Sequence, residues 1–395
     1  MGICKALLLK SLLIGLEVNR VRAFIPRTLG CRAMKASPMK TSTTPQDAIT
    51  SQDMQLLEGI RELAHDYDLF LLDMWGVMHD GTRPYEGVIE CVRQLNQAGK
   101  SLVILSNSSK RVDHSKKMLR KLGFDPETDF DLILTSGEVS HRLLSGDADI
   151  LNICSWSPIM NLIGDEVNKK VLVFGSGEED AEYVQSAGWS LATSIAEAKL
   201  LIARGTFTIV QGEKDTVYKK ESPVKYDERL AEILKEAATY QIPMLVCNPD
   251  KVRPDEGLPP MPGAIGDAYV LRLLEQTSMS KQNAELLVKR IGKPYRELYQ
   301  LALKSSSTAR ACMVGDSLET DITGGMKFLS NGATVWIIQD GIHGPTVREA
   351  GVPYPEAVQK TMDTFNAGSA ETPRMGQEEG FMNIRPNFVL QHFNW

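Results

Sequence analysis

The sequence predicts an α/β fold built on a parallel β-sheet. From residue 68 onward, short apolar runs alternate with segments whose apolar residues recur at helical spacing. Each apolar run stops at glycine or a polar turn residue, which is typical of the buried strands of a parallel sheet. The alternation of strands and helices favours right-handed crossovers between parallel neighbours. Ligands bind such sheets at the carboxyl ends of the strands, so polar residues there are the first candidates for a site.

The elements are expected in a regular order along the chain. An amphipathic helix is expected to lead in from Gln52 to His65. The predicted strands are at residues 69–72, 101–105, 131–134, 170–174, 199–203, 242–247, 311–314 and 334–338. The predicted helices are at residues 86–98, 112–122, 137–144, 180–187, 226–240, 264–274, 280–289 and 294–303. From Gly368 the chain turns polar and loses its periodicity, so residues 368–395 are expected to form a mostly loose tail.

Length and composition indicate a large globular protein. The chain has 395 residues and a formal net charge of -6. Because basic residues concentrate in the first 46, the remainder is acidic, which argues against nucleic acid as a partner. No segment is expected to span a membrane. The six cysteines lack metal-binding spacing, and Cys247 and Cys312 lie in apolar runs where a buried, reduced thiol is expected.

Residues 1–46 are predicted to be a targeting presequence. An apolar stretch from Ala6 to Leu16 is interrupted by Lys10, and eight Lys or Arg accompany one acid, Glu17. This composition is typical of transit peptides. Its order resembles the bipartite presequences of algae with complex plastids, and a mitochondrial presequence fits nearly as well. We therefore expect an organelle, plastid or mitochondrion; the alternative is a tail without an address on a cytoplasmic protein.

Polar residues that suit phosphoryl transfer follow three of the predicted strands and precede one helix. In chain order they are Asp73, Ser106, Asn107, Lys293, Asp316 and Asp321. A carboxylate can attack phosphorus, a hydroxyl can bind the phosphoryl oxygens, and a lysine can neutralise their charge. Paired carboxylates suit Mg²⁺, a hard cation that prefers oxygen ligands. Because parallel strands end at one edge of the sheet, these groups can converge there.

Taken singly, these residues have plainer interpretations. Strand-end aspartates are often turn formers, Ser106 and Asn107 could cap the next helix, and Lys293 could be an ordinary solvated lysine. Their joint occurrence at successive strand ends favours a site. Residues 175–179 could suggest a nucleotide-binding loop, but the third glycine of that fingerprint is absent. We interpret them as a strand-to-helix turn.

These motifs resemble those of the haloacid dehalogenase (HAD) superfamily, and especially its class IIA, the sugar-phosphatase and nitrophenyl-phosphatase-like branch. The resemblance rests on Asp73 in DMWG, Ser106, Asn248-Pro249-Asp250, Gly292-Lys293-Pro294 and GDSLETD at residues 315–321. It implies that Asp73 is the nucleophile and that Ser106, Asn107 and Lys293 bind substrate. It also implies a Mg²⁺ ion held by Asp73, the backbone carbonyl of Trp75, Asp316 and Asp321.

The resemblance further implies a Rossmann-like core with an inserted α/β class IIA (C2-type) cap. The core is expected at residues 52–134 and 241–367, and the cap at residues 135–240. Such a cap excludes water and selects the leaving group. A homodimer through the cap is a further expectation. Residues 277–290 look longer than the family usually has there, and we assign them no function.

One departure from the family pattern leaves two alternative functions open. Two residues after the nucleophile the family has an aspartate that protonates the leaving group and later activates water, whereas this chain has Trp75. Loss of a positioned acid/base typically costs about 10² to 10⁴ in rate. The preferred prediction is a Mg²⁺-dependent phosphatase that hydrolyses a small phosphorylated metabolite, with reduced activity, through an aspartyl-phosphate. The alternative is a phospho-ligand binding or interaction module without useful turnover. His79 or Asp80 could replace the missing acid/base.

Overall fold

The computed structural model describes residues 54–164, 169–177, 179–213, 215–253, 259–304, 310–371 and 383–395. The predicted presequence, residues 1–46, lies outside these residues. Among the residues described, no helix combines the length and the apolar character that a membrane span requires. Cys247 and Cys312 are buried and unpaired, as expected from their apolar runs.

The first sheet has seven parallel strands in the order β1-β14-β13-β12-β2-β3-β4. These strands are β1 (Gln55–Leu56), β2 (Leu69–Leu72), β3 (Ser101–Ser106), β4 (Leu132–Thr135), β12 (Ala311–Gly315), β13 (Ala333–Ile337) and β14 (Phe388–Leu390). The predicted parallel α/β sheet is thereby confirmed. Leu72 at the end of β2 pairs with Val314 of β12 and with Ile104 of β3. The carboxyl ends of these three strands therefore lie at one edge.

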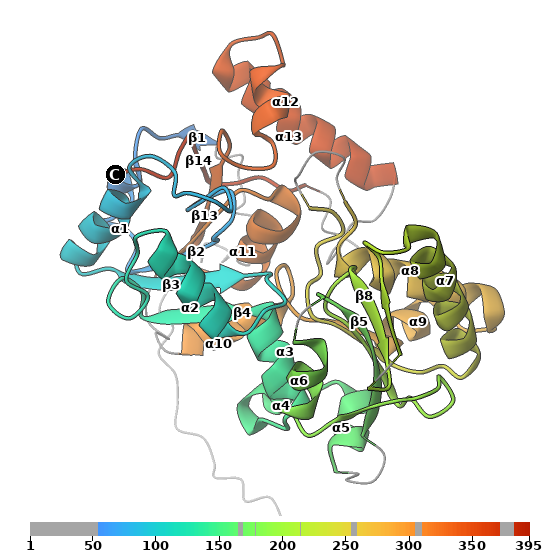
Figure 1. The fold of residues 1–395 in the computed structure, drawn as a ribbon. Coiled ribbons are helices and arrows are strands. Elements are labelled where there is room, and N and C mark those ends of the chain that lie inside the picture. Colours follow the sequence, from blue (N-terminus) through green and yellow to red (C-terminus); the bar gives the residue numbers. More distant parts are fainter. Residues whose placement is uncertain are drawn as a thin grey trace, which may run out of the picture. The chain divides into compact units, whose positions relative to one another are not determined.

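Helices cover both faces of the first sheet (Figure 1). They include α1 (Val88–Gln97), α2 (Val112–Lys121), α3 (Ser136–Leu144) and α10 (Arg296–Lys304). Phe70 and Leu72 of β2 pack with α1 and α2, whereas Leu69 and Leu71 pack with α3 and α10. This division follows from the strand geometry, because successive side chains point to opposite faces.

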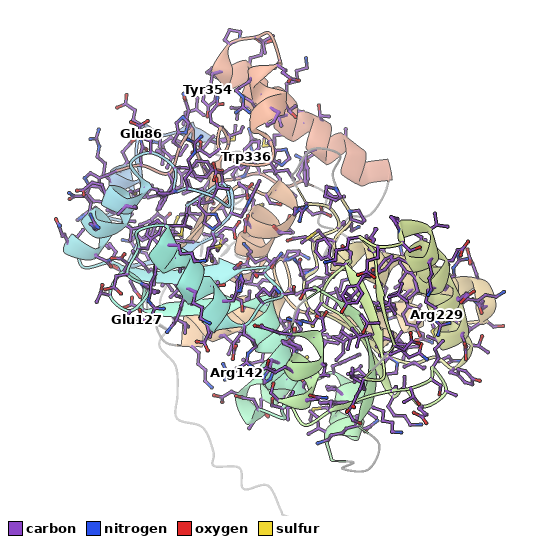
Figure 2. All side chains as sticks on the ribbon, viewed as in Figure 1. Glu86, Glu127, Arg142, Arg229, Trp336 and Tyr354 are labelled. Carbon is purple, nitrogen blue, oxygen red and sulfur yellow. The ribbon has the colours of Figure 1, made fainter. Side chains whose placement is uncertain are left out.

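The edge of the first sheet is extended and covered by the C-terminal part of the chain. Trp336 of β13 is fully buried against α13 (Tyr354–Glu371), while charged side chains such as Glu86 and Glu127 point outward (Figure 2). Two shorter helices, α11 (Thr323–Phe328) and α12 (Gly344–Arg348), precede and follow β13. This packing supports the strands that carry the site.

The second sheet is mixed and has the order β11-β10-β7-β5-β8-β9, with β6 paired to β5. Its strands are β5 (Lys170–Gly175), β6 (Ser190–Leu191), β7 (Leu200–Ala203), β8 (Thr208–Gln211), β9 (Asp215–Tyr218), β10 (Met244–Val246) and β11 (Val288–Arg290). Strand β8 is antiparallel to both of its neighbours, β5 and β9, and the other pairs are parallel. Helices α7 (Pro223–Thr239) and α8 (Pro262–Gln276) lie side by side against this sheet (Figure 1).

Four shorter helices complete this region: α4 (Ala148–Cys154), α5 (Ser157–Ile163), α6 (Asp180–Gln185) and α9 (Lys281–Leu287). The turn expected at residues 175–179 is confirmed, since β5 ends at Gly175 and α6 begins at Asp180. The helix expected at 280–289 stops at Leu287, and the chain continues as β11. Residues 277–290 thus add an edge strand to the second sheet.

The expected boundary between core and cap differs from the observed arrangement of the sheets. We expected residues 241–367 to return to the first sheet, but β10 pairs with β7 and β11 in the second sheet. The segment from 244 to 290 therefore belongs with the second sheet, and the chain returns to the first with α10. A buried apolar strand has the same local pattern in either sheet, so the sequence could not distinguish them.

The expectations for both ends of the globular region are wrong. The predicted helix from Gln52 to His65 is replaced by β1 and a short 3₁₀-helix, η1 (Ile60–Glu62), over the residues described. The predicted loose tail contains β14, which pairs with both β1 and β13. The Ile60 N–H donates to the Asn394 carbonyl at 2.9 Å. Pairing of the two chain ends has overridden the helical pattern, as tertiary contacts commonly do.

Candidate active site

Three predicted residues lie at the shared carboxyl edge of the first sheet. Asp73 directly follows β2, Ser106 ends β3, and Asp316 directly follows β12. The Asp73 N–H donates to the Val314 carbonyl at 2.9 Å, which continues the strand ladder to the site. Backbone pairing thus fixes where the Asp73 carboxylate emerges.

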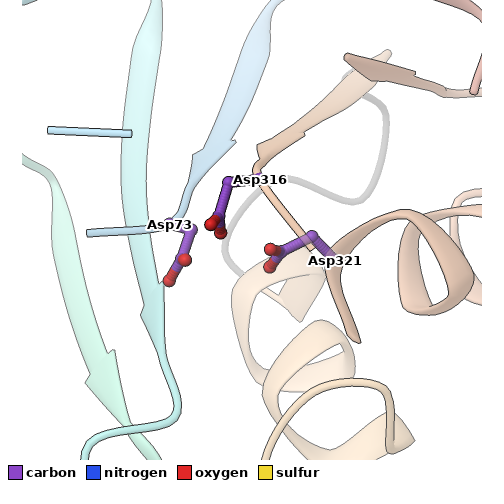
Figure 3. A group of neighbouring side chains, drawn as sticks. All are labelled: Asp73, Asp316 and Asp321. Carbon is purple, nitrogen blue, oxygen red and sulfur yellow. The ribbon is translucent and has the colours of Figure 1, made fainter. Parts of the chain in front are cut away.

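A triangle of carboxylates forms the centre of this edge. Asp73, Asp316 and Asp321 each have an oxygen within 4.8 Å of the others (Figure 3). Asp321 lies in a π-helical turn, η2 (Leu318–Ile322), and is fully buried. By contrast, the Asp73 side chain keeps 13% of its surface exposed, so a ligand can reach it. The three acids predicted to bind metal are therefore brought together.

Lys293 is the cation that faces this triangle. Its Nζ donates to Asp73 Oδ1 at 2.5 Å and lies 2.6 Å from Asp321 Oδ1. Burial alone would lower the pKa of this lysine, but the charges of Asp321 and Asp73 outweigh burial and raise it. Lys293 therefore stays protonated and holds the two carboxylates in place.

The negative charge of the triangle exceeds what Lys293 can balance. Burial raises the pKa of Asp73 despite the nearby Lys293. Burial, together with the charges of Asp73 and Asp321, raises the pKa of Asp316 well above its usual range. Burial also raises the pKa of Asp321 to about 6. Three converging acids with one lysine leave two surplus negative charges, and hard oxygen donors suit a divalent cation such as Mg²⁺. The donor set fits that ion.

Gly76 allows Asp316 to approach the loop that follows β2. It has a φ of +78°, and a Cβ atom added there would lie 2.3 Å from Asp316 Oδ2. The same Asp316 oxygen accepts the Ile342 N–H at 2.8 Å. Only glycine combines this backbone conformation with so little space.

The Asn107 side chain is hydrogen-bonded to Asp250 and to the backbone of Lys293. Its Nδ2 donates to Asp250 Oδ1 at 2.8 Å and to the Lys293 carbonyl at 3.0 Å. Its Oδ1 accepts the Lys293 N–H at 2.7 Å. Because these bonds use both amide hydrogens, the side chain positions Lys293 and Asp250. The substrate-binding role expected for Asn107 stays a prediction.

A cavity of about 330 Å³ opens over the carboxylate edge. Its polar floor contains Asp73, Ser106, Lys293 and Asp316. Its apolar wall consists of Trp75, Met118, Val252, Met261 and Ile342. Within the described part of the chain, none of the lining residues lies in the expected cap at 135–240; after β10, the lining residues are Asn248, Asp250, Lys251, Val252, Arg253 and Met261. Described residues that follow β10, and none from the predicted insertion, therefore border the cavity.

The two proposed substitutes for the missing acid/base are poorly placed. His79 Nδ1 accepts the Gly81 N–H at 2.9 Å, and its Nε2 is sealed from solvent without a hydrogen-bond partner. Burial lowers the pKa of His79 to about 4. The Thr82 hydroxyl and the N–H groups of Arg83 and Thr82 donate to Asp80 and hold its pKa well below the usual range. Asp80 does not line the cavity.

Strand-end acids beside a buried lysine are the kind of groups that phosphoryl transfer uses, and two family models match this chain. Residues 70–190 match the model of the haloacid dehalogenase-like hydrolase family, and residues 290–365 match a second model described as HAD-hydrolase-like. The chain belongs to the haloacid dehalogenase superfamily. The resemblance drawn from the motifs is thereby confirmed.

Solved structures share the fold. One is a haloacid dehalogenase-like hydrolase from Brucella suis, 21% identical, covering 74% of this chain and 92% of its own, with a TM-score of 0.52. Another is the p-nitrophenyl phosphatase from Archaeoglobus fulgidus, 20% identical, covering 83% of this chain and 97% of its own, with a TM-score of 0.51. At these identities the likeness establishes the fold alone.

A curated relative is much longer than the match. A Caenorhabditis elegans protein named as a NipSnap protein is 25% identical over 278 residues, which are 66% of this chain and 46% of that protein. This chain therefore spans less than half the length of that relative, and the match supports no assignment of activity.

The sequence interpretation missed Asp250 as a site residue. The motif Asn248-Pro249-Asp250 supported the family resemblance, but Asp250 was given no role in the site. The structure brings Asp250 to the cavity from the end of β10 in the second sheet. The signal that could have found it is the strand-end position itself.

Proposed function

We propose that this protein is a phosphatase that hydrolyses a small phosphoester through an aspartyl-phosphate on Asp73. The observation that supports this most strongly is the contact of a partly exposed Asp73 with a fully buried Lys293 beside two further acids. A structural salt bridge would need no surplus carboxylates. A carboxylate nucleophile is repelled by the negative phosphoryl oxygens, so a nearby lysine and a bound cation are needed to offset that repulsion.

Each residue has a distinct task in the proposed reaction. Asp73 attacks phosphorus, while the Ser106 hydroxyl and the Lys293 ammonium bind the phosphoryl oxygens. Asp316 and Asp73, with the Trp75 carbonyl and Asp321 in support, would hold Mg²⁺. When bound, that ion supplies positive charge that stabilises the phosphoryl oxygens. The apolar wall around Trp75 and Met118 suits a leaving group with a carbon skeleton.

The test is phosphate release by the full-length protein across a panel of small phosphomonoesters with Mg²⁺. We expect turnover that Asp73→Asn and EDTA each abolish. Asp363→Asn, which removes a surface carboxylate from α13, serves as the charge-matched control and should retain full activity. Turnover that survives Asp73→Asn would contradict the aspartyl-phosphate route.

Trp75 favours a second candidate function, a phospho-ligand binding module. An indole cannot move the proton that the family's aspartate moves. If the wild-type protein releases no phosphate from any ester but binds a phosphorylated ligand tightly, the binding module replaces the phosphatase. Titration calorimetry with the same panel distinguishes the two.

A further inference from the structure

The proposed reaction needs a group that gives a proton to the leaving oxygen and later takes one from water. Trp75 can do neither. Among the described residues that line the cavity, several titratable groups are already committed. Lys293 is held by two carboxylates, and Lys251 lies 2.9 Å from Asp267 Oδ2. Asp73 and Asp316 belong to the carboxylate triangle. His79 is closed off, which leaves Asp250 and Glu319 to be considered.

Asp250 is held in a fixed orientation at the cavity that Asp73 also lines. Its Oδ1 accepts Asn107 Nδ2 at 2.8 Å, and its backbone N–H donates to Asn248 Oδ1 at 2.8 Å. Asn107 in turn holds the backbone of Lys293, whose side chain contacts Asp73. A continuous hydrogen-bonded chain therefore joins Asp250 to Asp73.

The second oxygen of Asp250 is free to act. Oδ2 accepts no hydrogen bond from the described residues, and unlike His79 Nε2 it is not sealed from the cavity. Burial raises the pKa of Asp250 to about 6, against the opposing effects of Asn107 and Lys293. A carboxyl group in that range can donate and accept protons near neutral pH. The charge of Asp250 also contributes to the raised pKa of Asp73, so the two groups are close electrostatically.

We propose that Asp250 is the general acid and base of this active site, in place of the side chain that Trp75 lacks. The inference rests on the proposed phosphatase function. In the first step an Asp73 oxygen bonds to phosphorus and the bond from phosphorus to the ester oxygen breaks. The proton of the Asp250 carboxyl group passes to that oxygen, and an alcohol leaves. In the second step the Asp250 carboxylate takes a proton from water while the water oxygen bonds to phosphorus. The bond to Asp73 breaks, and inorganic phosphate leaves.

Asp250→Asn tests this role because the amide oxygen can still accept the Asn107 bond. We expect steady-state turnover of glycerol 2-phosphate to fall about 10² to 10⁴-fold. With p-nitrophenyl phosphate, the leaving phenolate needs no proton, whereas hydrolysis of the aspartyl-phosphate still needs a base. A burst approaching one nitrophenolate per chain should therefore precede a slow steady state. A positional role alone would give no burst.

Glu319→Gln is the matched variant, since it removes a carboxylate from the same cavity. A burst with Glu319→Gln and none with Asp250→Asn would overturn the assignment, as would wild-type turnover by Asp250→Asn. If Asp250→Asn does not fold, as judged by its melting curve, Asp250→Ser decides by the same burst criterion. If the wild-type protein itself gives neither turnover nor burst, the phosphatase function fails first and the acid/base role fails with it.

Discussion

Two buried ionic clusters in this molecule differ in their balance of charge. In the second sheet, Asp180 Oδ1 lies 2.6 Å from Arg204 Nη1, and the side chains are 5% and 1% exposed. Asp180 also accepts the N–H groups of Ser176 and Gly177 and the Thr208 hydroxyl. At the edge of the first sheet, by contrast, three carboxylates share one lysine.

The difference separates a structural ion pair from a site prepared for a ligand. Around Asp180 one acid meets one base, and neutral donors satisfy the carboxylate oxygens, so the two charges balance. Around Asp73, burial without a sufficient partner raises the pKa values of Asp73, Asp316 and Asp321, and the other carboxylates of the triangle add to the shifts of Asp316 and Asp321. Such unbalanced clusters are found at functional sites, where a bound ligand completes them.

The largest expected effect comes from neutralising one acid in each cluster. Asp73→Asn should lower phosphatase activity by on the order of 10⁴-fold or more, while the melting temperature without divalent ions stays level or rises. Asp180→Asn should do the opposite, retaining the site chemistry but losing about 3 to 5 kcal/mol of unfolding free energy, because Arg204 would keep an uncompensated buried charge.

Thermal melts and phosphate release on both variants check this crossed pattern. Equal losses of stability in the two variants would remove the distinction between the clusters.

The next largest effect is expected from Gly76→Ala, which tests whether Asp316 needs the close approach of the loop after β2. Gly76→Ala should reduce activity by on the order of 10²-fold, because its Cβ would displace the Asp316 carboxylate. Gly87→Ala is the matched control, since Gly87 has the same φ of +78° but nothing within 4 Å of an added Cβ. Both variants carry the same backbone strain. If steady-state assays give both the same activity, crowding of Asp316 is not what requires glycine.

A smaller effect should appear in the pH dependence of stability. Asp321 has a pKa raised to about 6 in the folded protein, mainly by burial. The folded state therefore holds this proton more tightly than the unfolded state does. The resulting stability is fully present below about pH 4 and is lost as the pH rises through about 6.

Urea denaturation in EDTA at stepped pH values measures this loss. Between pH 4 and pH 7 the wild-type protein should lose on the order of 1 to 3 kcal/mol more unfolding free energy than Asp321→Asn. If the unfolding free energies of the wild-type protein and the variant change equally between these two pH values, the cluster carries no surplus charge.

The smallest effect provides the reference for both clusters. Glu275 pairs with Arg272 at 2.6 Å on the surface of α8, with side chains 58% and 44% exposed. Glu275→Gln should change the unfolding free energy by less than about 0.5 kcal/mol, because solvent screens the pair. A change as large as that of Asp180→Asn, measured by the same denaturation, would mean that burial does not govern these interactions.

The sequence predicted the centre of the site because local sequence patterns mark the strand ends that form it. Asp73, Ser106 and Asp316 each follow an apolar run, and parallel strands bring such ends to one edge. Asp321 was named with the Asp316 strand end and Lys293 from its place before a helix, and the family resemblance then implied their roles. The structure brings all five together.

What the sequence could not predict depends on contacts between distant segments. Asp180 and Arg204 lie 24 residues apart, and no local pattern marks them as partners. Asp250 was given no role because a strand-end aspartate taken singly is often only a turn former, and its contact with Asn107 joins segments 143 residues apart. Phe388–Leu390 is a three-residue strand that pairs with β1 and β13, and its polar sequence surroundings suggested a loose tail.

The most direct test of the central claim is a calorimetric titration of the full-length protein with Mg²⁺. If the surplus charge at the first sheet prepares a cation site, the wild-type protein and Glu275→Gln should each bind one ion per chain. Asp316→Asn, which can still accept the Ile342 N–H, should bind at least about tenfold more weakly. Equal affinity in Asp316→Asn, or no binding by the wild-type protein at millimolar Mg²⁺, would contradict the account.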